Sequence, residues 1–208
     1  MKLGIIGKLF PLMFNKEVYE YTAKAIPAMD MREFKKRHKK EYEAMVKRTP
    51  SAGSMKDNMF APVMYMACYG FSYYKADPEH ITPEVFDGMI DALCKSDMMK
   101  RFYQGKNCFD PKEIDKYVRG AERSQKREYP MDWVFDFSYD LSVPEYYVTH
   151  RECGVCKIGK QEDLMFLVPH MCAMDYPTIE YKGGKLLRTK TLGSGGDCCD
   201  FHVVKGDR

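Results

Sequence analysis

The spacing of apolar residues changes near residue 128, and this change constrains the fold more than any other feature of the chain. Before it, apolar side chains recur every three or four residues, as on helices with one buried face. After it, apolar and polar residues alternate from Trp133 to Leu141, which is typical of a half-buried strand. The sequence therefore predicts an α+β protein, with a helical N-terminal half followed by a small antiparallel sheet with packed helices.

The two halves are expected to form one domain. The chain has 208 residues, which suits a single well-filled core, with a helical region at 1–127 and an α+β region at 128–208. Apolar residues make up 45% of the chain and charged residues 30%, which is typical of a folded globular protein rather than a disordered one. We expect the functional site in the α+β region, where most of the cysteines and histidines lie.

Helix signals divide the first region into four segments. One covers residues 15–48 and is interrupted at Pro27, and the second follows a loop at residues 49–54. Thr82, which precedes a proline, is expected to cap the third helix. Asp110 begins a capping-box-like signature and is expected to cap the fourth.

A strongly charged run at residues 32–43 is interpreted as the solvated face of a surface helix. His38 lies within this run and is expected to be an exposed surface histidine. The net charge of +3 is small for the length of the chain, whereas nucleic-acid-binding domains normally carry a strongly basic face. We therefore expect no nucleic-acid partner.

The segment Met1–Phe14, MKLGIIGKLFPLMF, is predicted to be a helical arm rather than a secretory leader. Glycine, lysine and proline residues interrupt its apolar run, and no small-residue cleavage site follows. No apolar run approaches the roughly 20 residues that a membrane span requires. The sequence therefore predicts a cytoplasmic protein with no membrane association.

The α+β region is predicted to contain two antiparallel strand pairs with helices between them. Pro169 should kink or end the longer helix and leave His170 and Cys172 at a junction. A glycine-rich turn at residues 193–196 joins the last two strands. The expected elements are strands at 133–141 and 145–151, a short helix or turn at 153–159, a helix at 161–175, and strands at 185–192 and 198–205.

The eight cysteines are expected to be reduced thiols, because the chain is large, lacks a leader and places three of them in helical segments. A zinc site and a redox pair are alternatives, but only Cys153 and Cys156 have close ligand spacing, and no thioredoxin-like order of elements surrounds them. We expect no cofactor, with zinc as the alternative. The residues that would have to supply zinc ligands are Cys153, Cys156, His170, Cys172, Cys198, Cys199 and His202.

Nucleophilic catalysis is the third interpretation of the same residues. A reactive thiol needs a neighbouring imidazole or helix N-terminus to lower its pKa, and a carboxylate to orient the base. His170, Cys172 and Asp175 are close enough in sequence to share a small pocket. On a regular helix these three side chains would not all face one way. They can share a pocket only if the break expected at Pro169 reorients the chain between them.

Four segments of the second region resemble the L-2-amino-thiazoline-4-carboxylic acid hydrolase family. They are Tyr-Val-Thr-His-Arg-Glu-Cys at 147–153, Cys-Ala-Met-Asp-Tyr at 172–176, Lys-Leu-Leu-Arg-Thr-Lys-Thr-Leu at 185–192 and Gly-Gly-Asp-Cys-Cys-Asp-Phe-His-Val at 195–203. The C-terminal pattern is also similar to vinyl-reductase-type small-molecule-binding domains. A shared fold does not fix the reaction, so both functions stay open.

The resemblance implies a substrate that is a cyclic isothiourea, whose ring is opened by water to a carbamoyl-cysteine. Cys172 or Cys153 would attack the amidine-like carbon C2, His170 would relay the proton, and Asp175 would hold the cationic nitrogens. A metal-activated water is the alternative nucleophile. The proposed substrate-binding residues are Arg188, as a clamp for the carboxylate, and the motif residues Thr191, Cys199 and Asp200.

Three functions therefore compete at this point. The first is a hydrolase that opens a C–N bond of a small cyclic amidine such as 2-amino-thiazoline-4-carboxylate. The second is a non-catalytic small-molecule-binding or sensor domain, and the third is a zinc-stabilised interaction protein. The expected partner is a small-molecule substrate, and whether the chain forms a homo-oligomer stays open.

Overall fold

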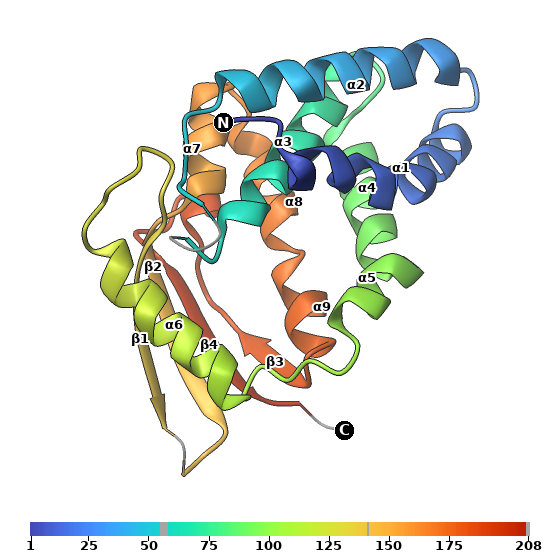
Figure 1. Ribbon diagram of the computed structural model, residues 1–208. Coiled ribbons are helices and arrows are strands. Elements are labelled where there is room, and N and C mark those ends of the chain that lie inside the picture. The colour runs from blue at the N-terminus through green and yellow to red at the C-terminus, as the bar shows by residue number, and fades with distance from the viewer. Residues whose placement is uncertain (55–57, 141, 207–208) are drawn as a thin grey trace.

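The computed structural model describes residues 1–54, 58–140 and 142–206. Helices come first along the chain, and a four-stranded antiparallel sheet with further helices follows (Figure 1), so the predicted α+β class is confirmed. The helices are α1 (Ile5–Ala25), α2 (Met31–Arg48), α3 (Ala61–Ala76), α4 (Pro83–Lys95), α5 (Asp97–Tyr103), α6 (Pro111–Ser124), α7 (Gly154–Gln161), α8 (Val168–Cys172) and α9 (Asp175–Glu180).

Side-chain caps begin several of these helices. The Thr82 hydroxyl accepts a hydrogen bond from the backbone N–H of Val85 at the start of α4, and the Asp110 carboxylate accepts one at the start of α6, as predicted. Asp30 caps α2 in the same way after the break that separates it from α1. The sequence patterns missed the short helix α5, which Ser96 caps.

His38 is buried, so the prediction that it is an exposed surface histidine is wrong. Only 1% of its surface is exposed. Its Nε2 lies 3.1 Å from the carbonyl oxygen of Tyr69, and its Nδ1 lies 3.0 Å from the hydroxyl of Tyr19. The charged residues of α2 surround one apolar stripe of this helix, and His38 lies on that stripe with Phe34 and Tyr42.

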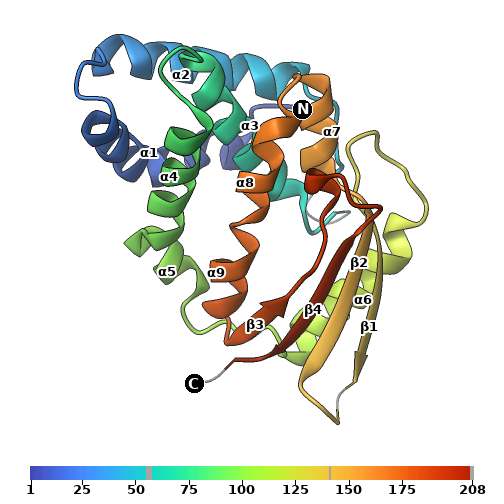
Figure 2. The ribbon, with the colours of Figure 1, turned by 180° about the vertical axis from the view of Figure 1, so that it is seen from behind.

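The sheet has the strand order β1-β2-β4-β3, and each neighbouring pair is antiparallel. His150 on β2 is paired with Cys199 on β4, so these two residues lie side by side on one face of the sheet. The opposite face carries exposed residues such as Tyr147 and is seen from the front in Figure 2, with α6 behind the sheet. The strands are β1 (Val134–Asp140), β2 (Glu145–Glu152), β3 (Gly184–Leu187) and β4 (Cys199–Lys205).

The helix predicted at residues 161–175 is replaced by shorter pieces. Asp163 follows the end of α7 with a φ of 59°, a left-handed conformation that stops the helix. A 3₁₀ turn at Met165–Leu167 then leads into α8, and Pro169 lies in the first turn of α8 instead of ending a helix. This arrangement creates the two junctions at which the candidate site is built.

The last strand pair is also shorter than predicted, because the chain leaves the sheet after Leu187. Thr191 caps a 3₁₀ turn at Leu192–Ser194, and Gly195 follows with a φ of 84°, which favours glycine. Within residues 1–54, 58–140 and 142–206, no helix combines the length and the apolar character that crossing a membrane requires.

Candidate functional site

A cavity of about 310 Å³ lies between the inner face of the sheet and the helices. Its floor is formed by the inward-facing residues of β2 and β4, and its walls come from the start of α3, from α6 and from the chain between α8 and α9. Most of the wall is apolar or aromatic, as in many small-molecule sites. The apolar side chains include Met59, Phe60, Val63, Met66, Met99, Trp133, Val148, Val155, Met171, Met174, Ile179 and Phe201.

Four of the predicted site residues line this cavity together. Cys153 directly follows β2, and Cys172 is the last residue of α8. Asp175 is the first residue of α9, and Cys199 is the first residue of β4. Segments far apart in the sequence therefore bring three thiols and one carboxylate to one hollow.

Arg188 and Asp175 form an ion pair at the edge of this group. The Arg188 guanidinium donates to the Asp175 carboxylate at 2.6 Å and to the Cys172 carbonyl at 3.0 Å. Only 5% of the Arg188 side chain is exposed, and its guanidinium lies 5.0 Å from the ring centres of Tyr176 and Phe201. Arg188 does not line the cavity, so it positions Asp175 and the end of α8 rather than presenting a free cation.

The Asp175 carboxylate is held in a protein environment that disfavours its charge. Burial raises its pKa above the ordinary value, although Arg188 opposes that shift. The side chain nevertheless keeps 38% of its surface accessible, as expected for a group that lines a hollow. A cation bound in the cavity would therefore pair with a carboxylate that is only partly compensated.

The three thiols are protonated at neutral pH. Burial, with the nearby charge of Asp175 as the second cause, raises the pKa of Cys172 to about 12. Burial raises the pKa of Cys199 to about 11. The pKa of Cys153 is raised well above its ordinary value, first by its hydrogen bond to the Cys156 thiol and second by burial. The cavity as described therefore contains no thiolate, and any nucleophile among these residues must be activated by what binds there.

His150 lines the cavity and was not among the predicted site residues. It is 8% exposed, and its Nδ1 is buried with no hydrogen-bond partner in the described chain. Burial, helped by the charge of Arg188, lowers its pKa to about 4, so the imidazole is neutral at pH 7. The sequence contains one signal for it. His150 continues the inward-facing series of Tyr146 and Val148, where a polar residue is unexpected.

Lys182 is a second lining residue that the sequence patterns did not indicate. Burial lowers the pKa of its ammonium group, and its Nζ lies 5.8 Å from the ring centre of Tyr103. Among the described residues it takes part in no ion pair. The cavity is thus lined by two carboxylates, Asp175 and Glu113, and by one ammonium group, Lys182. The charges of both carboxylates oppose the lowering of the pKa of Lys182.

His170 lies outside the cavity, although it was expected to relay a proton to Cys172. Its Nδ1 is 2.9 Å from the Asp87 carboxylate, and its ring packs edge-on against Phe86 of α4. Residues two positions apart on a helix project in nearly opposite directions, because each residue turns the helix by about 100°. His170 and Cys172 therefore face different sides of α8, and the structure does not bring them together.

Thr191 and Asp200, which were expected to bind substrate, also lie outside the cavity. The Thr191 hydroxyl accepts from the backbone N–H of Ser194. The Asp200 carboxylate accepts from the backbone N–H groups of Thr189 and Lys190. Both side chains hold the turn before β4 in place, and that turn positions Cys199.

Metal ligation depends on how the sulfur, nitrogen and carboxylate groups are arranged. All eight cysteines are free thiols in this structure. His202 lies beside Tyr147 on the outer face of the sheet and bonds to Glu145, so it faces away from the cavity thiols. Over the described ranges, no three His, Cys, Asp or Glu side chains are grouped so that they could hold a metal ion.

Comparison with known proteins gives one match. A family model described as L-2-amino-thiazoline-4-carboxylic acid hydrolase matches residues 57–203. That segment contains every residue that lines the cavity. No curated protein and no solved structure matches the chain.

Proposed function

The chain belongs to the L-2-amino-thiazoline-4-carboxylic acid hydrolase family, and on that premise we propose that it opens the ring of a small cyclic isothiourea carboxylate by hydrolysis. One observation carries this proposal. A single cavity contains the carboxylate of Asp175, the ammonium of Lys182, the thiol of Cys172 and the neutral imidazole of His150. Asp175 and Lys182 carry charges opposite to those of such a substrate, and Cys172 and His150 are the residues proposed to act as nucleophile and proton carrier.

Two charged residues of the cavity, Asp175 and Lys182, complement the two charges of the substrate. An isothiourea is cationic when protonated and would pair with Asp175, which Arg188 alone only partly compensates. The substrate carboxylate would pair with Lys182, whose ammonium is partly buried and lacks an ionic partner in the described chain. This assignment gives Lys182 the clamp role that the sequence interpretation gave to Arg188. The apolar wall would enclose the ring.

Cys172 is the proposed nucleophile, because Asp175 is the nearby charge that most raises the pKa of its thiol. A substrate cation paired with Asp175 cancels that effect and favours the thiolate when substrate is present. Cys153 is a weaker candidate, since its thiol is engaged with the Cys156 thiol.

The reaction then proceeds in two balanced steps. Cys172 Sγ bonds to C2 while its proton passes to His150, and the π electron pair of the C2–N double bond moves onto nitrogen. His150 passes the proton to the ring nitrogen, the lone pair of the exocyclic nitrogen forms a double bond to C2, and the C2–N bond to the ring nitrogen breaks, so that the amine is released. Because the pKa of His150 is about 4, the imidazole does not keep the proton.

Water completes the reaction by adding to C2 of the covalent intermediate. The C2–S bond to Cys172 then breaks, the thiol is restored, and C2 becomes the carbonyl carbon of a carbamoyl group. Water releases two protons as its oxygen becomes the carbonyl oxygen. One restores the Cys172 thiol, and the other ends on the amine that was freed in the first step. The net change is the addition of one water and the cleavage of one C–N bond.

A binding domain without turnover is the second candidate, and the protonation of the cavity thiols favours it. All three lining cysteines have raised pKa values, as in an inert apolar pocket. On this alternative, Asp175 and Lys182 would hold a zwitterionic ligand, and Cys172 would only contribute to the wall.

The two candidates are separated by incubating the purified protein with 2-amino-thiazoline-4-carboxylate. We expect mass spectrometry to detect a product that has gained one water, at a rate proportional to protein concentration. Calorimetry on the same sample measures binding. Saturable binding without product would favour the binding domain, and the absence of both binding and product would reject the cavity assignment.

A further inference from the structure

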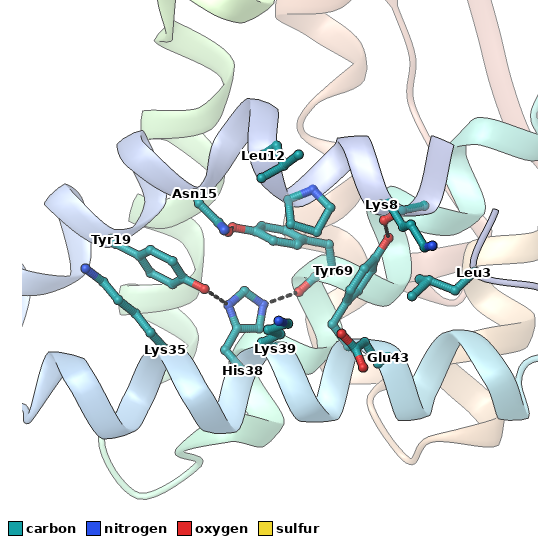
Figure 3. Close-up of a pocket in the computed structure, with 13 residues that line it drawn as sticks. Leu3, Lys8, Leu12, Asn15, Tyr19, Lys35, His38, Lys39, Glu43 and Tyr69 are labelled. Atoms are coloured by element: carbon teal, nitrogen blue, oxygen red, sulfur yellow. Dashed lines mark hydrogen bonds between the residues drawn. The ribbon is translucent and has the colours of Figure 1, made fainter. Parts of the chain in front are cut away.

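A second pocket, with a volume of about 560 Å³, lies between α1 and α2 and shares no lining residue with the central cavity (Figure 3). Apart from Tyr69 of α3, all of its lining residues precede the segment that the family model matches. The family assignment therefore says nothing about this pocket. Its size is that of a site for a small organic molecule.

The floor of the pocket is a preformed network of rings. His38 lies between the hydroxyl of Tyr19 and the backbone carbonyl of Tyr69, as the dashed lines in Figure 3 show. The carbonyl can only accept, so Nε2 carries the proton and the Tyr19 hydroxyl donates to Nδ1. The Tyr69 hydroxyl donates to Oδ1 of Asn15, which leaves the amide N–H groups of Asn15 as further donors on the wall.

This floor is electrically neutral. Burial lowers the pKa of His38 to about 4 and raises the pKa of Tyr19 to about 12, so neither group is charged at pH 7. The charge of the pocket therefore comes from side chains nearer its rim.

The rim carries more positive than negative charge. Lys8, Lys35 and Lys39 line it together with one carboxylate, Glu43. None of the three lysines takes part in an ion pair within the described part of the chain, although Lys35 Nζ lies 5.2 Å from the ring centre of Tyr19. Leu12, also a lining residue, leaves 75% of its surface exposed, so an occupant that covered it would remove apolar surface from water.

We propose that the pocket between α1 and α2 binds a small organic anion with a flat apolar body. The body would lie against the rings of Tyr19 and Tyr69 and against Leu12, and the anionic group would lie among the rim lysines. Asn15 would donate a hydrogen bond to a polar atom of the occupant. The site is independent of the central cavity, so its test does not depend on the proposed hydrolase activity.

Two probes of the same shape test the charge requirement. Naphthalene-2-carboxylate is titrated into the full chain and compared with naphthalene-2-carboxamide, which has the same rings without the negative charge. We expect saturable binding of the carboxylate and about tenfold weaker binding of the amide, because the exposed ammonium groups of the rim lysines each contribute modestly. Equal affinities for the two probes, or no saturable binding of the carboxylate, would overturn the proposal.

Matched variants locate the site. Substituting Lys35→Gln and Lys39→Gln together should weaken carboxylate binding about fivefold to tenfold, whereas Lys36→Gln with Lys40→Gln removes the same charge from exposed positions of α2 outside the pocket and should have no effect. Lys182→Gln, in the central cavity, should also leave the affinity unchanged. The proposal fails if Lys182→Gln weakens binding and the Lys35/Lys39 pair does not, because the probe would then occupy the central cavity.

Discussion

The central cavity and the α1–α2 pocket each contain a buried histidine, and the two imidazoles differ in what surrounds their nitrogen atoms. His38 and His150 both have a pKa lowered to about 4 by burial. Both nitrogens of His38 have partners, whereas Nδ1 of His150 has none in the described chain. Burying a polar atom without a hydrogen-bond partner costs about 1–3 kcal/mol of folding stability. Such an atom therefore calls for an explanation, for example a role in binding or catalysis. The same titration behaviour therefore accompanies a fully hydrogen-bonded imidazole in one hollow and, in the other, an imidazole that we propose acts on substrate.

The largest effect is expected in the central cavity at the proposed nucleophile. Cys172→Ser should lower turnover of 2-amino-thiazoline-4-carboxylate on the order of 10³-fold, because a hydroxyl in this setting is a far poorer nucleophile than a thiol. Steady-state kinetics measures this change. Cys198→Ser is the matched control, since Cys198 is a buried thiol that does not line the cavity, and it should keep near-normal turnover. Equal loss in both variants would remove the special role of Cys172.

The next effect concerns substrate affinity at the basic side of the same cavity. Lys182→Gln should raise KM about tenfold and change kcat little, because the lysine is assigned to the non-reacting carboxylate. Comparison with the methyl ester of the substrate sharpens the test, since the ester should bind the wild type and the variant alike. A fall in kcat at unchanged KM would contradict this assignment.

The histidine of the α1–α2 pocket should affect stability instead. Its folded pKa of about 4 lies below the ordinary 6.5, so its contribution is complete above pH 6.5 and is lost as the pH falls toward 4. His38→Gln should cost about 2 kcal/mol of unfolding free energy at pH 7 through its two hydrogen bonds. It should also make the loss of stability between pH 6.5 and pH 4 shallower than in the wild type.

Denaturant titrations at a series of pH values measure both quantities for His38→Gln. Turnover at pH 7 should stay within about twofold of the wild type once unfolded protein is accounted for. Parallel stability curves for wild type and variant would mean that the charge state of His38 is not linked to folding.

The smallest effect is expected at His170, the base that the sequence interpretation placed beside Cys172. His170→Gln should change kcat less than about twofold, because the side chain pairs with Asp87 outside the cavity. The same kinetic assay serves for this variant. A loss as large as that of Cys172→Ser would show that α8 presents its other face to the substrate.

The sequence indicated the helices and strands well where a local rule decides the structure. Thr82 and Asp110 cap helices as predicted, and the alternation after Trp133 marks β1. The rules failed between residues 161 and 175, where the apolar spacing predicts one continuous helix. Asp163 adopts a left-handed backbone conformation and interrupts that helix. They also failed at His38, since a single buried stripe is hard to find among the many charges of α2.

For the site, the motifs selected Cys153, Cys172, Asp175 and Cys199, and the fold brings these four together. The same motifs selected Thr191 and Asp200, whose side chains stabilise a turn next to the site. A sequence motif does not distinguish residues that support a site from residues that line it. Lys182 and His150 were missed, since each becomes a cavity residue only through contacts between distant segments. Of these two residues, only His150 has a signal in the sequence, because it is a polar residue in the inward-facing series of positions of a strand.

The central claim is that the unpartnered imidazole of His150 acts on substrate bound in the central cavity. The most direct measurement is kcat for His150→Gln, with substrate affinity and melting temperature measured on the same preparation. We predict a loss of about 10²-fold or more in kcat, a dissociation constant within about threefold, and a melting temperature within a few degrees of the wild type. Wild-type turnover in the folded His150→Gln protein would contradict the claim.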